Sequence, residues 1–171
     1  SLLPERPVRE LRAEAAAFFA LPQDDKQRLR HDGVFGYLGP GCENVGATYG
    51  KKTEGPDLVE SLNLPGYQEP GSLWHARASE DECPWKAAPW MAAAPEPLRR
   101  AAVAYWGAST RLMLVLMSLS EAALDLPKGF FDASFEQPGA LLRLAYYPSL
   151  EGAIEQNEEG EPQQSYGAHT D

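Results

Sequence analysis

The chain is poor in cysteine and lacks any long uninterrupted apolar run. Its two cysteines, Cys42 and Cys83, lie far apart, with no Cys-x-x-Cys pair and no histidine at ligand spacing. We therefore expect reduced thiols in an intracellular protein rather than a disulfide framework. No run of eighteen apolar residues and no secretory signal pattern occurs, so we expect a cytoplasmic location and no membrane partner.

Positive charge is also scarce. Lys and Arg number 15 against 25 Asp and Glu, which gives a formal net charge of −10. Nucleic acids and anionic membrane surfaces select basic patches, so this balance argues against both as partners. A small-molecule substrate or a metal ion is the expected partner, and no oligomeric state follows from the composition.

The chain does have enough apolar residues for a sizeable core. Its 171 residues are 43% hydrophobic, which indicates one globular domain or a large part of one.

Two segments near the start of the chain predict helices. Apolar side chains recur at helical spacing between Val8 and Ala20, with charged side chains on the opposite side, which is typical of an amphipathic helix. Leu21-Pro22 then predicts a stop, and a short second helix is expected from Asp24 to Leu29, capped by Asp24 or Asp25.

The longest helical pattern runs from Pro97 to Leu126. Proline suits the first helical position, and Leu126-Pro127 predicts the end of the helix. The central stretch, Leu112 to Met117, is apolar all round. We therefore expect this helix to be the most buried one.

A first strand is predicted from Asp57 to Pro65, where one face would carry Leu58, Glu60, Leu62 and Leu64. Because that face is mostly apolar, Glu60 requires a partner or an edge position. The glycine-rich residues 31–55 before this strand predict turns. The Pro- and Trp-rich residues 66–97 after it predict a segment that wraps a surface.

A second strand is predicted from Ala140 to Tyr147. Alternation places Leu142, Leu144 and Tyr146 on one face. The opposite face is the more polar one and carries Leu141, Arg143, Ala145 and Tyr147.

The chain ends in a His-x-Asp tripeptide. In an extended strand His169 and Asp171 would point the same way and could hold one ion. With a second imidazole from elsewhere, they would complete an arrangement that leaves iron(II) three open positions. Taken alone the tripeptide is a weak signal, and a surface His and Asp at a strand end is the alternative interpretation.

Six short motifs follow one another in a specific order. They are Phe-Phe-x-Leu-Pro (18–22), Gly-Tyr (36–37), Asp-Leu-x-Glu-Ser-Leu (57–62), Leu-Pro-x-x-Phe-Phe (126–131), Leu-Arg-Leu-x-Tyr-Tyr-Pro (142–148) and His-Thr-Asp (169–171). This succession covers nearly the whole chain and resembles the iron(II)- and 2-oxoglutarate-dependent oxygenases of the isopenicillin-N-synthase-like family.

The resemblance implies an α+β fold with a double-stranded β-helix, or jelly-roll, core and outer helices, incomplete at both ends in this chain. Residues 1–95 would form the N-terminal dioxygenase region, and residues 96–171 the long core helix and the first part of the jelly roll. The family's second histidine and its Arg-x-Ser pair do not follow Asp171 within these residues. We therefore expect the chain to be inactive on its own.

The resemblance also implies a site. His169 and Asp171 would bind Fe(II), and Tyr147 would lie near the co-substrate 2-oxoglutarate, with dioxygen as the oxidant of a small organic molecule. Ala145 stands where family members often have Asn, so one polar contact is expected to be absent.

Two alternative functions stay open. The chain could belong to an iron oxidase that does not use 2-oxoglutarate, or to a non-catalytic domain that kept the fold.

Residues 151–164 are rich in glutamate and carry no basic residue. They predict either a lid near the metal or, more simply, a solvated loop.

Overall fold

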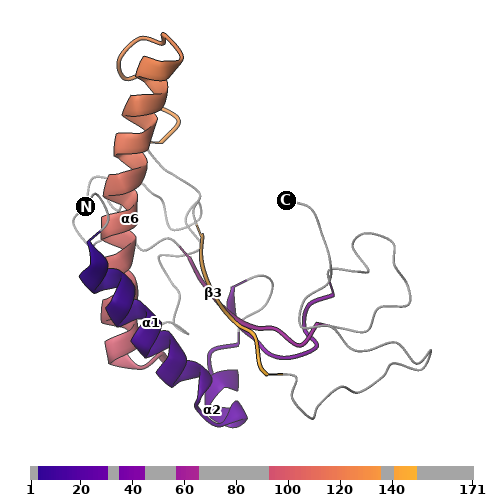
Figure 1. The fold of residues 1–171 in the computed structure, drawn as a ribbon. Helices are drawn as coiled ribbons and strands as arrows, with labels where there is room; N and C mark the ends of the chain where they lie inside the picture. The colour runs from indigo at the N-terminus through magenta and orange to yellow at the C-terminus, as the bar shows by residue number, and fades with distance from the viewer. Residues whose placement is uncertain (1–3, 31–34, 45–56, 66–92, 136–140, 150–171) are drawn as a thin grey trace. The chain divides into compact units, whose positions relative to one another are not determined.

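The computed structural model describes residues 4–30, 35–44, 57–65, 93–135 and 141–149 (Figure 1). Its helices are α1 (Glu5–Phe19), α2 (Gln23–Gln27) and α6 (Glu96–Ala123), and its strands are β1 (Gly36–Leu38), β2 (Glu60–Pro65) and β3 (Leu141–Tyr146). The chain divides into two compact units, one of Ser1–Ala20 with Leu64–Leu142 and one of Leu21–Asn63 with Arg143–Asp171.

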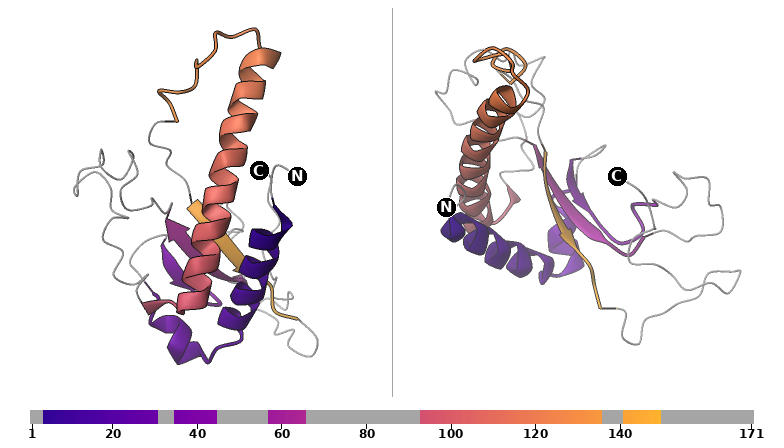
Figure 2. Two further views of the ribbon diagram at one scale, coloured as in Figure 1. Left: turned by 90° about the vertical axis from the view of Figure 1, so that its left-hand side faces the viewer. Right: turned by 45° about the horizontal axis from the view of Figure 1, so that its top comes forward.

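In the first unit α1 packs against α6. Figures 1 and 2 show α1 alongside the N-terminal half of α6, while the C-terminal half extends beyond it. The side chains that α1 buries are Leu11, Phe18 and Phe19. Those that α6 buries are Leu98, Ala101, Ala102, Ala108 and Glu121. Small alanines on α6 allow two helix backbones to approach closely, which suits this contact.

The predicted helices are found, with different ends. Helix α1 begins at Glu5 rather than Val8, with Pro4 at the N-cap position. Prolines are tolerated there because the first N–H groups of a helix have no partner inside it. The predicted cap of α2 is wrong: Pro22 is the N-cap residue, no side chain caps the helix, and Asp24 and Asp25 lie in the first turn. There they interact favourably with the helix dipole.

The prediction that the long helix is the most buried one is wrong for its C-terminal half. Leu98 near the start of α6 is 1% exposed, whereas Leu119 is 57% exposed and Leu114, Val115 and Leu116 are exposed as well. The apolar sequence predicted the helix correctly. Burial depends on neighbours, and Figure 2 shows α1 alongside the N-terminal half of α6.

In the described ranges, α6 is long and apolar enough to cross a membrane. The mean hydropathy of its most apolar window is 1.3, and 11% of that window is buried. Core helices of water-soluble proteins meet the same criteria, so the finding is weak evidence for a membrane span.

The three strands form one sheet in the order β1-β2-β3. Strands β1 and β2 are antiparallel, with Tyr37 opposite Leu62 and Leu38 opposite Ser61. Since directly opposed residues share a face, Tyr37 lies on the same face as Glu60, Leu62 and Leu64. Ser61 and Asn63 lie on the other face, and β2 is buried on both.

An α+β composition is therefore observed, with helices and an antiparallel strand pair. The predicted strands are shorter than expected, since β2 begins at Glu60 rather than Asp57 and β3 spans Leu141–Tyr146.

Candidate functional site

The residues predicted to form the site fall partly outside the structure. His169 and Asp171 lie outside the described residues, as does the acidic segment 151–164. Within the part of the chain that the structure describes, no group of three or more His, Cys, Asp or Glu side chains could hold a metal ion. Tyr147 directly follows β3 and is exposed. The ligand and co-substrate roles of these three residues stay predictions.

Strand β3 shows the alternation that the sequence predicts over most of its length. Leu142 and Leu144 are half-buried, whereas Leu141, Arg143 and Ala145 are exposed. Tyr146 departs from the pattern because it is exposed as well.

A polar cluster in the second unit joins β2, β3 and the turn after β1. The Nη2 atom of Arg143 donates to both carboxylate oxygens of Glu43, at 3.1 Å to Oε1 and 2.8 Å to Oε2. The Oγ atom of Ser61 donates to Oε1 of the same carboxylate at 2.8 Å. Arg143 and Ser61 therefore lie on the same side of the sheet, and we call these three residues the Glu43 cluster.

The backbone of Glu43 is fixed as well. The N–H of Asp57 donates to the Glu43 carbonyl at 2.8 Å, and the N–H of Gly41 donates to the Asp57 carbonyl at 2.8 Å. Gly41 has φ +79°, which favours glycine. The turn that carries Glu43 is thus tied to the residues that lead into β2.

A second polar cluster lies on the opposite face of β2. Oε2 of Glu60 accepts a hydrogen bond from Nζ of Lys26 at 2.5 Å and another from the hydroxyl of Tyr37, whose oxygen also lies 3.1 Å from Oε1 of Gln23. Glu60, Lys26 and Tyr37 are all buried. The predicted need of Glu60 for a partner is confirmed, and the partner comes from α2.

Burial raises the pKa of Tyr37, and its hydrogen bond to the Glu60 carboxylate raises it further. Burial removes the water that would stabilise a phenolate, and a phenolate would also lie beside the negative charge of Glu60. Tyr37 is therefore a hydrogen-bond donor, not a base, and the cluster ties α2, β1 and β2 together.

Sequence reasoning placed Arg143 on the polar face of β3 but did not identify Glu43 or Ser61 as its partners. The available signal was a single charged residue between two leucines of a strand, which calls for a counter-charge. Glu43 is 100 residues away in the chain, so sequence spacing does not point to it.

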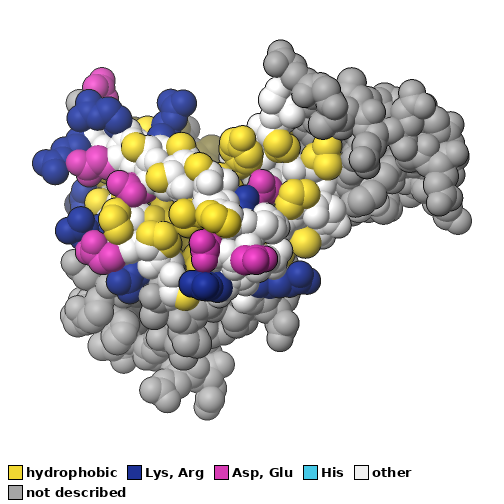
Figure 3. All heavy atoms as spheres, turned by 90° about the horizontal axis from the view of Figure 1, so that it is seen from below, with side chains coloured by type: hydrophobic (Ala, Val, Ile, Leu, Met, Phe, Trp, Pro, Cys, Tyr) yellow, Lys and Arg dark blue, Asp and Glu magenta, His cyan; other side chains and the backbone are white. Residues whose placement is uncertain are grey.

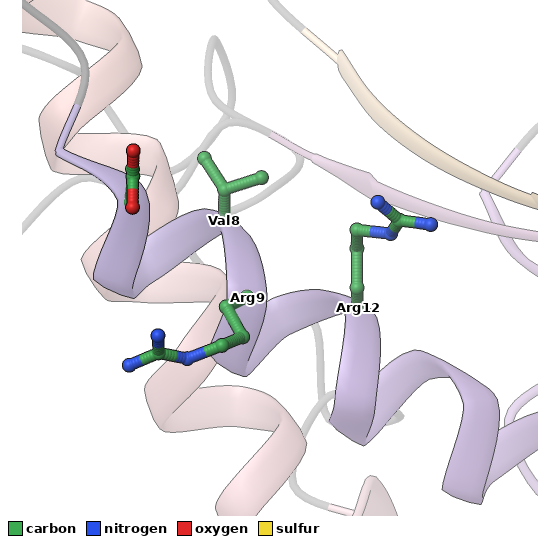
Figure 4. A pocket seen from close by; sticks show the side chains of 4 residues that line it. Val8, Arg9 and Arg12 are labelled. Atoms are coloured by element: carbon green, nitrogen blue, oxygen red, sulfur yellow. The ribbon is translucent and has the colours of Figure 1, made fainter.

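Other surface features carry less chemistry. Figure 3 shows one face of the molecule, on which apolar patches lie among side chains of both charge signs. A hollow of about 290 Å³ on α1 is lined by Glu5, Val8, Arg9 and Arg12. In Figure 4 Val8 and Arg12 point to one side of the helix and Arg9 to another, so the two guanidinium groups do not converge. Cys42 is exposed and free, and Cys83 lies outside the described residues.

No protein-family model matches the chain. Curated relatives do. The 2-oxoglutarate-Fe(II) type oxidoreductase ppzC of Metarhizium rileyi is 29% identical over 152 residues, which cover 82% of this chain and 39% of the relative. Validamycin A dioxygenase of Streptomyces hygroscopicus is 28% identical over 174 residues, which cover 99% of this chain and 44% of the relative. The chain thus spans less than half the length of these relatives.

Solved structures show a similar fold. A 2OG-Fe(II) oxygenase family protein from Caulobacter crescentus matches with a TM-score of 0.58 and 17% identity, over 97% of this chain and 59% of that one. A full-length Neurospora crassa protein, solved in complex with alpha-KG, matches with a TM-score of 0.56 and 19% identity, over 85% of this chain and 42% of that one.

Proposed function

We propose that this chain is part of an Fe(II)- and 2-oxoglutarate-dependent oxygenase that oxidises a small organic molecule. The proposal is carried by one observation: relatives in sequence and a neighbour in fold are named as oxygenases of this kind, over most of the chain. The jelly-roll core, the isopenicillin-N-synthase-like branch and a cytoplasmic location are parts of the same proposal.

In this proposal His169 and Asp171 are two of the iron ligands. An imidazole nitrogen and a carboxylate oxygen are donors that iron(II) accepts, and their spacing of two residues in a strand keeps both on one side. Bound there together with 2-oxoglutarate, iron(II) would supply the oxidation of the substrate by dioxygen. His169 must be neutral to donate its lone pair, so its other ring nitrogen requires a hydrogen-bond acceptor.

Tyr147 would contact the co-substrate. Tyr147 directly follows β3, and extending the alternation of the strand by one residue would place it on the side of Arg143. The names of the relatives specify 2-oxoglutarate, so the oxidase without 2-oxoglutarate is not favoured. A non-catalytic domain is not favoured either, because the relatives are named as dioxygenases or oxidoreductases.

The test is an anaerobic Fe(II) titration of the full-length protein. His169→Ala and Asp171→Ala should each weaken iron binding by at least about 100-fold, more than the loss expected for an outer partner of a ligand. The wild-type protein with iron and dioxygen should also convert 2-oxoglutarate to succinate.

Matched variants serve as controls. His31→Ala removes a histidine with no ligand pattern, and Asp24→Ala removes an exposed aspartate of α2. Both should bind iron like the wild type. Wild-type iron affinity in both His169→Ala and Asp171→Ala would overturn the proposed function.

A further inference from the structure

One face of the sheet is unusually polar for its degree of burial. Ser61 and Asn63 alternate with apolar residues along β2 and are 0% and 4% exposed. Arg143 lies on the same side of the sheet, where it and Ser61 both donate to the carboxylate of Glu43. Burying polar side chains is costly unless they are hydrogen-bonded. Ser61 and Arg143 meet this condition through Glu43. This face therefore carries a hydrogen-bonded polar group that ends in the guanidinium of Arg143.

The guanidinium of Arg143 is held in one place. A single nitrogen, Nη2, makes both contacts to Glu43, so the guanidinium group is anchored at one of its corners. The ion pair is partly buried, with side-chain exposures of 33% for Arg143 and 14% for Glu43. Glu43 is fixed in turn by Ser61 and by the Asp57 N–H. Such an arrangement is pre-organised before any ligand arrives.

Strand alternation relates this group to the proposed site. Arg143, Ala145 and Tyr147 have the same parity along the end of β3, and Arg143 and Ala145 are exposed whereas Leu144 between them is half-buried. Extended one residue past β3, this alternation would place Tyr147, and the co-substrate that it is proposed to contact, on the side that carries Arg143.

We propose that Arg143 binds a carboxylate on the substrate side of this sheet and that Glu43 is its positioning residue. The inference rests on the proposed function. Guanidinium groups bind carboxylates through planar, charge-assisted hydrogen bonds. The carboxylate belongs either to 2-oxoglutarate or to the substrate, and the two sources give different results below.

The first arm measures equilibrium binding of 2-oxoglutarate to the full-length protein by calorimetry, with Mn(II) in place of iron and without dioxygen. The second arm adds a panel of small carboxylic acids, each beside its neutral amide, to the 2-oxoglutarate-saturated protein and measures the thermal stabilisation. Arg143→Gln should weaken binding in one arm by roughly 10- to 100-fold, the factor for losing a hydrogen bond to a charged group. Arg143→Lys should recover part of the affinity, and Glu43→Gln should lose less than Arg143→Gln.

The results assign the source. Weaker 2-oxoglutarate binding in Arg143→Gln assigns the carboxylate to the co-substrate. Unchanged 2-oxoglutarate binding, with acids that stabilise the wild type but not Arg143→Gln, assigns it to the substrate. Wild-type behaviour of Arg143→Gln in both arms overturns the inference, while iron binding and succinate formation would still support the proposed function. A wild type that binds neither iron nor 2-oxoglutarate overturns the proposed function and this inference with it.

Two further variants separate binding from folding. Arg143→Gln leaves Glu43 without its counter-charge, so the double variant Glu43→Gln/Arg143→Gln removes both charges together. If the pair has only a structural role, the double variant regains thermal stability and binds carboxylates like the wild type, which also overturns the inference. Arg111→Gln on the exposed side of α6 is the matched arginine control and should leave both arms unchanged.

Discussion

Glu60 accepts hydrogen bonds from two buried donors on two different elements, Lys26 on α2 and Tyr37 on β1. A buried carboxylate is stable only while its partners remain, because each ion of such a pair has lost its hydration. This one side chain therefore connects segments that are 23 and 34 residues away from it in the chain.

Replacing Glu60 tests that connection. Glu60→Gln should lower the free energy of unfolding by about 3–5 kcal/mol, because Lys26 is left buried with an uncompensated charge. The exposed pair of Arg6 and Glu10 is the control, and Glu10→Gln should change stability by less than about 0.5 kcal/mol. Urea unfolding measures both. Equal effects of the two variants would show that the buried pair does not form in solution.

Tyr37 makes stability depend on alkaline pH. Its pKa is raised in the folded protein above the ordinary value of 10.0, so above that pH the unfolded chain loses a proton that the folded protein keeps. Stability is then fully present below pH 10.0 and falls as pH rises, by up to about 1.4 kcal/mol per pH unit for one proton.

Thermal melts from pH 8 to pH 11, a range chosen to bracket the unperturbed tyrosine pKa of about 10, check this effect. Tyr37→Phe should be less stable than the wild type at the lower end, because Glu60 loses one donor, and its stability should fall less between the two ends. Parallel pH profiles of the two proteins would contradict the raised pKa.

At the residue scale the sequence predicts that a partner is needed but not which one. The face shared by Glu60, Leu62 and Leu64 is apolar, and this predicted a counter-group correctly. Lys26 gave no such signal, because a lysine in a short polar helix is ordinarily solvated. Its burial follows from the tertiary contact alone.

The end of α6 depends on one unusual residue. Asp125 has φ 54°, in the left-handed region, and the N–H of Leu126 donates to the Glu121 carbonyl at 2.9 Å. This hydrogen bond is the one that defines a Schellman motif at the end of a helix. In that motif the residue with the left-handed conformation, here Asp125, is usually glycine. The Glu121 carboxylate also accepts the N–H groups of Gly129 and Phe131, at 3.0 and 3.2 Å, which fixes the following turns.

Asp125→Gly should therefore stabilise the protein by about 0.5–1 kcal/mol, because glycine adopts this conformation without the penalty of a Cβ atom. Asp125→Ala is the control, since it keeps the Cβ and removes only the carboxylate. It should be no more stable than the wild type in thermal melts. Equal stabilisation by Gly and Ala would show that the carboxylate, and not the backbone conformation, is unfavourable.

Elements were easier to predict than their surroundings. Helical periodicity from Pro97 onward predicted α6 to within three residues at its C-terminal end, since periodicity is a local property of the chain. The exposure of Leu119 is not local, because it depends on what packs against the helix. For the same reason the pairing of Arg143 with Glu43 was found only in the structure.

At the scale of the whole molecule, the chain spans 39% to 44% of the length of its curated relatives. In the proposed site it supplies one imidazole and one carboxylate of a set that needs a second imidazole. It also carries the Glu43 cluster and Tyr147, which belong to the proposed binding side. In the proposed function, the second imidazole comes from a residue that the structure does not describe.

The 171-residue chain, expressed alone, should form no succinate from 2-oxoglutarate above the metal-free background, whereas the full-length protein should. A coupled succinate assay with both proteins at equal concentration measures the difference. Turnover by the short chain would contradict this prediction, and a His75→Ala variant would test whether that histidine completes the ligand set.

Strand β2 contributes to a polar cluster on each of its two faces. Glu60 binds Lys26 and Tyr37 on one face, and its neighbour Ser61 donates to Glu43 on the other. A slip of one position would exchange these neighbours, because a pleated strand turns each successive side chain to the opposite side. Insertion or deletion of a single residue between Glu60 and Asn63 would thus break two sets of contacts at once. These are the contacts of Glu60 with Lys26 and Tyr37, and those of Ser61 and Arg143 with Glu43. Natural length variation should therefore be confined to the turns on either side of this strand.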